Sequence, residues 1–324
     1  MPEGHSVHRI ARQFRANFFG VPIIASSPQG RFADGAAVIS GQKMVEVFAV
    51  GKQMFAKFER GDWLRVHLGI YGAWDFAGDI KMDATISSAN GRMGQTNQRG
   101  TVLDTAGENS MTSIGAPRLS RMRMSEQSKV TSGDVEFPPE PVGAVRLRLL
   151  TPTVCADLRG PTACEVLTDA QVTAVIDRLG PDPQHDSSDV ARDKFVNAVR
   201  KRATPVGQLL MDQSVVAGIG NVYRAEMLFR ASIDPYRPGN AVTTDEAHAM
   251  WADWVKLLAI GIDTGQMMTM DGLSAKQWKA AMASRDDRHW VYKREGLSCR
   301  VCGTNIALAD MQNRKLYWCP SCQT

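Results

Sequence analysis

The distribution of apolar and polar residues predicts one amphipathic helix at the start of the chain, over residues 3–18. Its apolar positions recur at helical spacing: Val7, Ile10, Ala11, Phe14 and Phe18. This spacing places them on one face of a helix. Pro2 and Glu3 suit the beginning of such a helix, because proline is favoured in a first turn and a carboxylate is stabilised at the positive end of the helix dipole.

The next part of the chain predicts β-structure. Between residues 36 and 76, the segments AAVIS, MVEVFAV, QMFAKF and DWLRVHL are short, rich in β-branched and aromatic residues, and separated by turns that contain glycine. Residues from about 80 to 137 are polar, Gly/Ser-rich and without period, which predicts a long flexible insertion. The segment AVRLRLL then alternates cleanly and predicts a strand returning to the same domain. We therefore expect an N-terminal β-rich domain over residues 1–163.

A helical region and a small cysteine-rich end follow. From Leu167 onward the apolar spacing is helical, which predicts a helical domain over residues 164–288 and a separate end over 289–324. The fold class is therefore expected to be α+β. Apolar residues make up 44% of the chain, and no apolar run is long enough to cross a bilayer. Without a signal-peptide pattern either, we expect a cytoplasmic protein.

Four of the six cysteines lie in the last 26 residues and form two CxxC pairs with sixteen residues between them: Cys299, Cys302, Cys319 and Cys322. Four thiolates are the preferred ligands of a structural Zn²⁺, and each CxxC pair supplies two of them from one tight turn. Such a closed site leaves no position for water, so this zinc is expected to be structural. The hairpin between the pairs carries Arg314 and Lys315, which suits a contact to phosphate. A zinc ribbon that binds proteins is the alternative for this motif alone.

Two further motifs are suggestive but weak by themselves. In AGIGN, Gly218 and Gly220 permit a tight turn, and Asn221 starts the next helix; backbone N–H groups there suit an anion, although plain packing is the commoner role. Lys52 follows Gly51 in the turn between two predicted strands, where a lysine is usually only solvated. The net charge of +4 is compatible with a polyanionic partner.

Taken in order, these motifs resemble the Fpg/Nei family, the formamidopyrimidine-DNA glycosylases and endonuclease VIII enzymes of bacterial base excision repair. The shared features are the initial Pro-Glu-Gly, Gly-Lys on a hairpin, HLGIYG, DLRGP, AGIGN and the final CxxC…NRKLYWCPSCQ. The resemblance covers the chain except the insertion. It implies a two-layered β-sandwich with a flanking helix, a helix-two-turn-helix domain and a zinc finger. It also implies a monomeric, nucleoid-associated DNA glycosylase and AP lyase that acts on damaged DNA.

The resemblance implies roles for three catalytic residues. Pro2, exposed as the terminal residue once Met1 is removed, is the nucleophile that attacks a sugar C1′ and forms an iminium. An α-amino group has a pKa of roughly 8 against about 10 for lysine, so more of it is unprotonated at neutral pH. Glu3 resembles the general acid/base that protonates the sugar ring oxygen. Lys52 resembles the hairpin lysine that approaches the phosphates of the lesion.

Other residues resemble DNA contacts of the family. Asn221 and Arg314 correspond to residues that hold the backbone around an extruded nucleotide. Ile70 and Tyr71 stand where wedge side chains enter the base stack, and Arg159 stands where an arginine contacts the orphaned base. The aliphatic–Tyr pair resembles the endonuclease VIII branch, which prefers oxidised pyrimidines such as thymine glycol and 5-hydroxyuracil. A purine-lesion glycosylase and a non-catalytic DNA-binding zinc-finger protein are the alternatives.

One departure concerns the active site. Many family members read Pro-Glu-Gly-Pro-Glu, whereas this chain has Ser6 in place of the second carboxylate. His5 or His8 is the candidate substitute.

Overall fold

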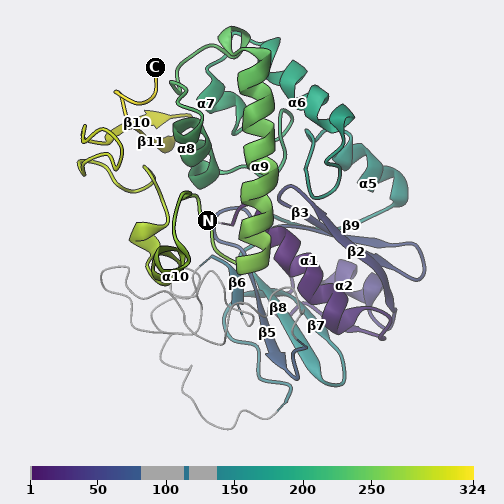
Figure 1. The fold of residues 1–324 in the computed structure, drawn as a ribbon. Helices are drawn as coiled ribbons and strands as arrows, with labels where there is room; N and C mark the ends of the chain where they lie inside the picture. Colours follow the sequence, from purple (N-terminus) through teal and green to yellow (C-terminus); the bar gives the residue numbers. More distant parts are fainter. Residues whose placement is uncertain (1, 82–112, 117–136) are drawn as a thin grey trace. The chain divides into compact units, whose positions relative to one another are not determined.

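The computed structural model describes residues 2–81, 113–116 and 137–324, and its chain divides into two compact units (Figure 1). The N-terminal unit comprises Met1–Asp177 together with Ile262–Gly265, and the C-terminal unit comprises Arg178–Gly261 and Gln266–Thr324. Residues 164–177, expected in the helical domain, belong to the N-terminal unit. The reason is β9 (Ala163–Leu167), which pairs with β4 (Trp63–His67).

The N-terminal unit contains two antiparallel sheets that form a two-layered sandwich. One has the strand order β2-β3-β4-β9 and adds β2 (Met44–Val50) and β3 (Gln53–Phe58) to the strands above. The other has the order β1-β7-β8-β5-β6. Its strands are β1 (Ile24–Ser26), β5 (Ala73–Gly78), β6 (Ser113–Gly115), β7 (Val145–Leu150) and β8 (Val154–Arg159). Buried residues of both sheets share one hydrophobic core.

The first helix, α1 (Gly4–Phe18), closes this core. Its apolar face is fully buried, and the Phe14 ring meets the rings of Trp74 and Phe76 on β5 edge-on, with centroids 4.8 and 5.4 Å apart. This geometry is the favoured one for aromatic pairs. The helix predicted over residues 3–18 is thus confirmed, with Glu3 as its N-cap residue. The first residues of the chain are therefore held against the core.

Two sequence predictions for this unit need correction or completion. AAVIS was expected as a strand, but Ala33–Ile39 is a helix, α2, in which Ala36 and Ile39 lie three positions apart and are both buried. Within the insertion expected from about 80 to 137, Ser113–Gly115 form β6, the edge strand beside β5. The remainder of that prediction, residues 82–112 and 117–136, lies outside the described residues.

The C-terminal unit is mainly helical. It contains α6 (Asp189–Arg200), α7 (Val206–Leu209), α8 (Asn221–Arg230), most of α9 (Thr244–Thr264) and α10 (Ala275–Ala283). Near its C-terminus the unit contains a hairpin of β10 (Ala307–Met311) and β11 (Arg314–Trp318). Helix α5 (Asp169–Ile176) belongs to the N-terminal unit. Among the described residues, no helix has the length and apolarity needed to cross a membrane.

Candidate functional site

The start of α1 buries two of the three predicted catalytic residues. Pro2 is buried, and Glu3 is completely excluded from solvent. Glu3 occupies the N-cap position in extended backbone, and its carbonyl accepts a hydrogen bond from the Ser6 amide at 3.0 Å. Ser6 Oγ in turn lies 3.1 Å from Nε2 of the buried His5. The position of the missing second carboxylate thus holds a serine–histidine hydrogen bond beside Glu3.

Two arginines of α1 attach this helix to residues at the end of α9. The fully buried Arg9 donates from Nη1 to the main-chain carbonyl of Ile262 at 2.9 Å, and Arg12 pairs with Asp263 at 3.3 Å. Both partners belong to Ile262–Gly265, the end of α9 and the residue after it, which group with the N-terminal unit. Sequence reasoning missed this contact, because about 250 residues separate the partners.

Lys52 lies at the tip of the β2–β3 hairpin. Val50 pairs with Gln53, so Gly51 and Lys52 form a two-residue turn, and Gly51 has a φ of +58° that glycine adopts without strain. Gln53 pairs in turn with His67 on β4. Burial lowers the pKa of His67, and the charges of Lys52 and Arg65 lower it further. Lys52 and His67 therefore share one end of the four-stranded sheet.

The loop Leu68–Gly72, which we name the wedge loop, joins β4 to β5 and exposes the two predicted wedge residues. Ile70 is 41% exposed and Tyr71 is 62% exposed. The loop is closed by a hydrogen bond from the Gly72 amide to the Leu68 carbonyl at 3.0 Å. A side chain at Gly69, whose φ is +64°, would meet Thr162 Oγ1 at 1.9 Å. The side chains of Ile70 and Tyr71 therefore project from a turn that packs closely against Thr162.

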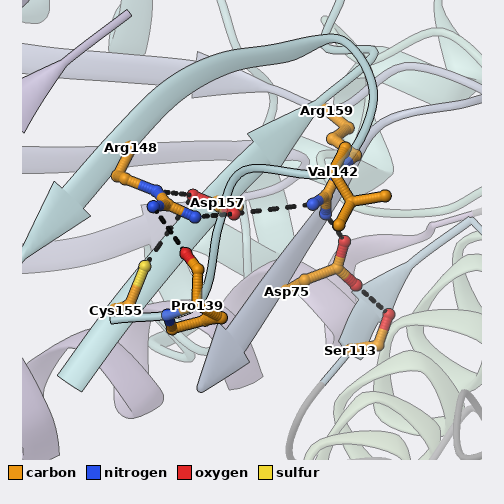
Figure 2. Close-up of polar contacts among 8 residues, drawn as sticks. All are labelled: Asp75, Ser113, Pro139, Val142, Arg148, Cys155, Asp157 and Arg159. Atoms are coloured by element: carbon orange, nitrogen blue, oxygen red, sulfur yellow. Dashed lines mark hydrogen bonds and ion pairs between the residues drawn. The ribbon is translucent and has the colours of Figure 1, made fainter. Parts of the chain in front are cut away.

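Arg159 is placed differently from the two wedge residues. It is 6% exposed, and its guanidinium forms an ion pair with Asp75 on β5 and a longer one, 3.5 Å, with Asp157. Its Nε donates to the carbonyl of Val142 at 2.7 Å (Figure 2). These partners occupy much of its donor capacity inside the sheet. The contact to an orphaned base stays a prediction, and the structure adds an interior role.

Arg148 completes a buried network around Arg159. It binds both carboxylate oxygens of Asp157, at 2.7 and 2.8 Å, and donates to the Pro139 carbonyl at 2.8 Å (Figure 2). Asp75 also accepts a hydrogen bond from Ser113 Oγ on β6. Two arginines thus balance two aspartates, and the same groups hold β6 and the segment 139–142 to the sheet. A network of this kind is favourable only when its donors and acceptors are satisfied.

In the C-terminal unit, the AGIGN turn is built around Gln213. Its side-chain amide donates to the Ile219 carbonyl at 3.0 Å, and its Oε1 accepts from the Gly218 amide at 3.0 Å. Gly218 has a φ of +95°, which requires glycine. The turn leads into α8, which begins at Asn221 as predicted. Gln213 was not identified from the sequence, where a lone glutamine carries no signal.

The first residue of α8 is tied to the terminal hairpin. Asn221 Nδ2 donates to the Lys315 carbonyl at 2.8 Å, and the buried Arg224 donates both to Asn221 Oδ1 and to the same carbonyl. Arg314 is the first residue of β11, directly after the turn residues Gln312 and Asn313, which both have positive φ. The structure therefore brings Asn221 close to the strand segment that carries Arg314.

A buried carboxylate on the same helix holds the connection to the hairpin. Glu226 is fully excluded from solvent and accepts from the amides of Trp290, Val291 and Tyr292 at 2.8–2.9 Å. Burial raises its pKa, which these hydrogen bonds oppose. It also accepts from Thr269 Oγ1. Sequence reasoning missed Glu226, because its helical pattern gave no reason to expect a buried acid.

The four C-terminal cysteines converge on one point. The Sγ atoms of Cys299, Cys302, Cys319 and Cys322 all lie within 4.8 Å of one another. The Cys302–Cys319 and Cys299–Cys322 separations are 3.4 and 3.9 Å. Zn–S bonds of about 2.3 Å in a tetrahedron place sulfur atoms roughly 3.8 Å apart, so the four thiols fit such an ion. Cys299 and Cys319 also pack against α8 residues such as Phe229.

Comparison with known proteins matches the N-terminal and the C-terminal parts of the chain to two different domain families. The formamidopyrimidine-DNA glycosylase N-terminal domain matches residues 1–112, and the formamidopyrimidine-DNA glycosylase H2TH domain matches residues 179–271. The chain is 36% identical over 324 residues to endonuclease 8 1 of Mycobacterium tuberculosis, with 100% of both chains covered. It is 35% identical over 146 residues to formamidopyrimidine-DNA glycosylase of Thermus thermophilus, covering 45% of this chain and 54% of the relative.

Solved structures show the same fold. A Lactococcus lactis FPG mutant in complex with DNA containing Fapy-dG aligns over 100% of both chains with a TM-score of 0.68 and 18% identity. At this identity the likeness concerns the fold alone.

Proposed function

The chain belongs to the family of formamidopyrimidine-DNA glycosylases and endonucleases VIII, and we propose that it is a bifunctional DNA glycosylase and AP lyase that excises oxidised pyrimidines. The observation that carries the proposal is the burial of Pro2 and Glu3 together at the start of α1. A helix anchored by aromatic packing and by Arg9 holds both residues in place. Such preorganisation is what a covalent nucleophile and its acid/base partner require.

The proposed reaction begins at the nitrogen of Pro2, which is free to react once Met1 has been removed. This nitrogen bonds to C1′ of the damaged nucleotide while the bond from C1′ to the base breaks, and the base leaves with a proton. Glu3 then protonates the ring oxygen as the C1′–O4′ bond breaks, which leaves an iminium. Loss of a C2′ proton expels the 3′ phosphate, and a further proton loss expels the 5′ phosphate. Water releases Pro2 by hydrolysing the iminium.

Lys52, Asn221 and Arg314 are proposed to bind the phosphates around the lesion. A positive side chain at a hairpin tip and an amide at a helix start are both suited to phosphate oxygens. Support for Asn221 comes from its bond to Lys315, which fixes the helix start against the hairpin that carries Arg314. Damaged DNA is thus the proposed partner, bound by a monomer in the bacterial cytoplasm.

The four-cysteine cluster is proposed to hold one structural Zn²⁺. Its ligands would be the four thiolates, and the ion would supply fold stability and no chemistry on the substrate. Packing of Cys299 and Cys319 against α8 supports this, because the ion would then stiffen the contact between the hairpin and the helix.

The preference for oxidised pyrimidines rests on Ile70 and Tyr71, the exposed aliphatic–aromatic pair of the wedge loop. The test compares strand nicking of one duplex sequence that carries thymine glycol, 5-hydroxyuracil or 8-oxoguanine, using protein confirmed to begin at Pro2. We expect faster nicking at the two pyrimidines. A preference for 8-oxoguanine would support a purine-lesion enzyme instead. Salt-dependent binding without any nicking would support a non-catalytic DNA-binding protein.

Matched lysine variants connect this test to the site. Lys52→Gln is expected to slow nicking at every lesion. Lys43→Gln removes the same charge from an exposed position before β2 and is expected to leave nicking unchanged. Equal rates for the two variants would contradict a role of Lys52 at the lesion.

A further inference from the structure

A small basic pocket opens on the N-terminal unit beside the wedge loop. It has a volume of about 220 Å³ and is lined by Gln29, Arg31, Arg146 and Arg159, together with Tyr71 and Gly160. Pockets for drug-sized ligands measure about 300–1,000 Å³, so this one suits a single ionic group rather than a whole nucleotide. Three arginines and no carboxylate line it. Its chemistry therefore favours an anion.

Two of these arginines have donors to spare. Arg146 uses only Nε, which donates to Gln29 Oε1 at 3.0 Å, and its two Nη atoms have no partner among the described residues. Arg31 is exposed, and its side chain likewise forms no hydrogen bond or ion pair in the part of the chain that the structure describes. The positive charge of Arg159 is neutralised by its ion pairs with Asp75 and Asp157. The unused positive charge of the pocket therefore comes from Arg31 and Arg146.

The turn that carries Arg31 is fixed to the start of β7. Ser27 Oγ donates to the Arg146 carbonyl at 2.7 Å and accepts from the Phe32 amide at 3.1 Å. The Gln29 amide donates to the Val145 carbonyl at 2.9 Å, and Gly30 adopts a φ of +81°. The backbone that carries Arg31 and Arg146 is thus organised before any ligand binds. Guanidinium groups held in this way suit the oxygens of a phosphate.

The strand registers place Lys52 beside the start of the wedge loop and the pocket beside its end. The loop begins after His67, which pairs with Gln53 next to Lys52. It ends before Ala73, which pairs with Arg159, and Arg159 pairs with Val145 next to Arg146. Lys52 therefore flanks the loop at the end of one sheet, and the pocket flanks it at the end of the other.

From this order we propose that Arg31 and Arg146 bind a backbone phosphate of the DNA strand opposite the lesion. The inference rests on the proposed function, which places the damaged strand at Lys52 and the side chains of the wedge loop in the base stack. A wedge between two strands has one strand on each side. The phosphodiester on the far side then meets the basic pocket that Tyr71 and Gly160 line beside the loop.

The test uses full-length protein confirmed to begin at Pro2, with Arg31 and Arg146 both replaced by glutamine. Fluorescence anisotropy measures binding to a tetrahydrofuran abasic analogue, in a duplex and in the same single strand, over about 50–200 mM salt. We expect the double variant to bind the duplex more weakly, with a salt slope reduced by about 0.9 for one lost phosphate contact. The ratio of wild-type to variant affinity for the duplex then falls by about 3.5-fold between the lowest and the highest salt concentration. Binding to the single strand should not change.

Arg60→Gln is the matched control, because Arg60 is exposed at the other end of β3 from Lys52. It should behave as wild type on both substrates. Arg31→Gln alone, a change at an exposed side chain, should show the same selective loss on the duplex and serves if the double variant unfolds.

Two results would overturn the proposal. Equal weakening on single strand and duplex would assign the pocket to the damaged strand, and unchanged binding on both would remove DNA from it. Failure of the proposed function would differ from either result, because it appears in the wild-type protein itself, which would then nick no lesion or would nick 8-oxoguanine fastest, whatever the variants bind.

Discussion

Arg159 and Asp75 form an ion pair between neighbouring strands, with both side chains less than a tenth exposed. The pair matters for more than the sheet, because Arg159 also holds the Val142 carbonyl and Asp75 also holds Ser113 on β6. Strand β5 follows directly on the wedge loop, and β8 ends at Arg159, one residue before Gly160, which lies beside the Tyr71 backbone. The ion pair thus supports the loop that exposes Ile70 and Tyr71.

Replacing Asp75 by asparagine should destabilise the N-terminal unit strongly. The change leaves Arg159 with one distant carboxylate partner, and breaking a buried ion pair by removing one member costs about 3–5 kcal/mol. Urea denaturation measures the change in unfolding free energy. Glu165→Gln, which removes the partner of Arg65 in a more exposed pair, should cost no more than about 1 kcal/mol. Similar losses for the two variants would contradict the structural role of the network.

Loss of one cysteine of the cluster should remove the metal and weaken DNA binding. Cys302→Ser leaves three thiolates, so we expect the zinc content to fall from one ion per chain and the terminal hairpin to lose its hold on α8. Elemental analysis and DNA-binding assays measure both effects. Cys164→Ser, at a cysteine outside the cluster, should retain full metal content. A Cys302→Ser variant with undiminished zinc would contradict the assignment.

Protonation of His67 should destabilise the fold at acidic pH. Burial, Lys52 and Arg65 lower its folded-state pKa below the ordinary value of 6.5, so the unfolded chain takes up this proton first as the pH falls. The unfolding free energy should therefore decrease as the pH drops through about 6.5 and level off below the folded-state pKa. His67→Asn should make the pH dependence of stability shallower in this window. An unchanged profile would show that His67 does not contribute to it.

Local pattern was sufficient for much of the fold. The apolar spacing located α1, the alternation in AVRLRLL located β7, and residue chemistry located the four cysteines and the helix start at Asn221. AAVIS was assigned wrongly, because a short apolar run suits a buried helix face as well as a strand.

Pairings between residues far apart in the chain could not be predicted from the sequence. β9 joins the N-terminal unit through β4, roughly a hundred residues earlier, so a boundary drawn from composition fell too soon. The partners of Arg159 and Glu226 likewise come from other elements. A single sequence contains no record of which strand lies beside which, and it therefore could not indicate that Arg159 is held in the interior.

The nucleophile is the central claim, and borohydride trapping tests it most directly. Protein confirmed by mass spectrometry to begin at Pro2 is incubated with a duplex carrying an abasic site and then reduced, which makes an iminium permanent. The controls are Pro2→Gly and wild-type sequence that retains Met1, whose Pro2 nitrogen is part of a peptide bond. We predict a covalent complex for the processed protein. The complex should be absent when Met1 is retained, and its amount should change in Pro2→Gly. No complex from the processed protein, or an equal one with Met1 in place, would contradict the account.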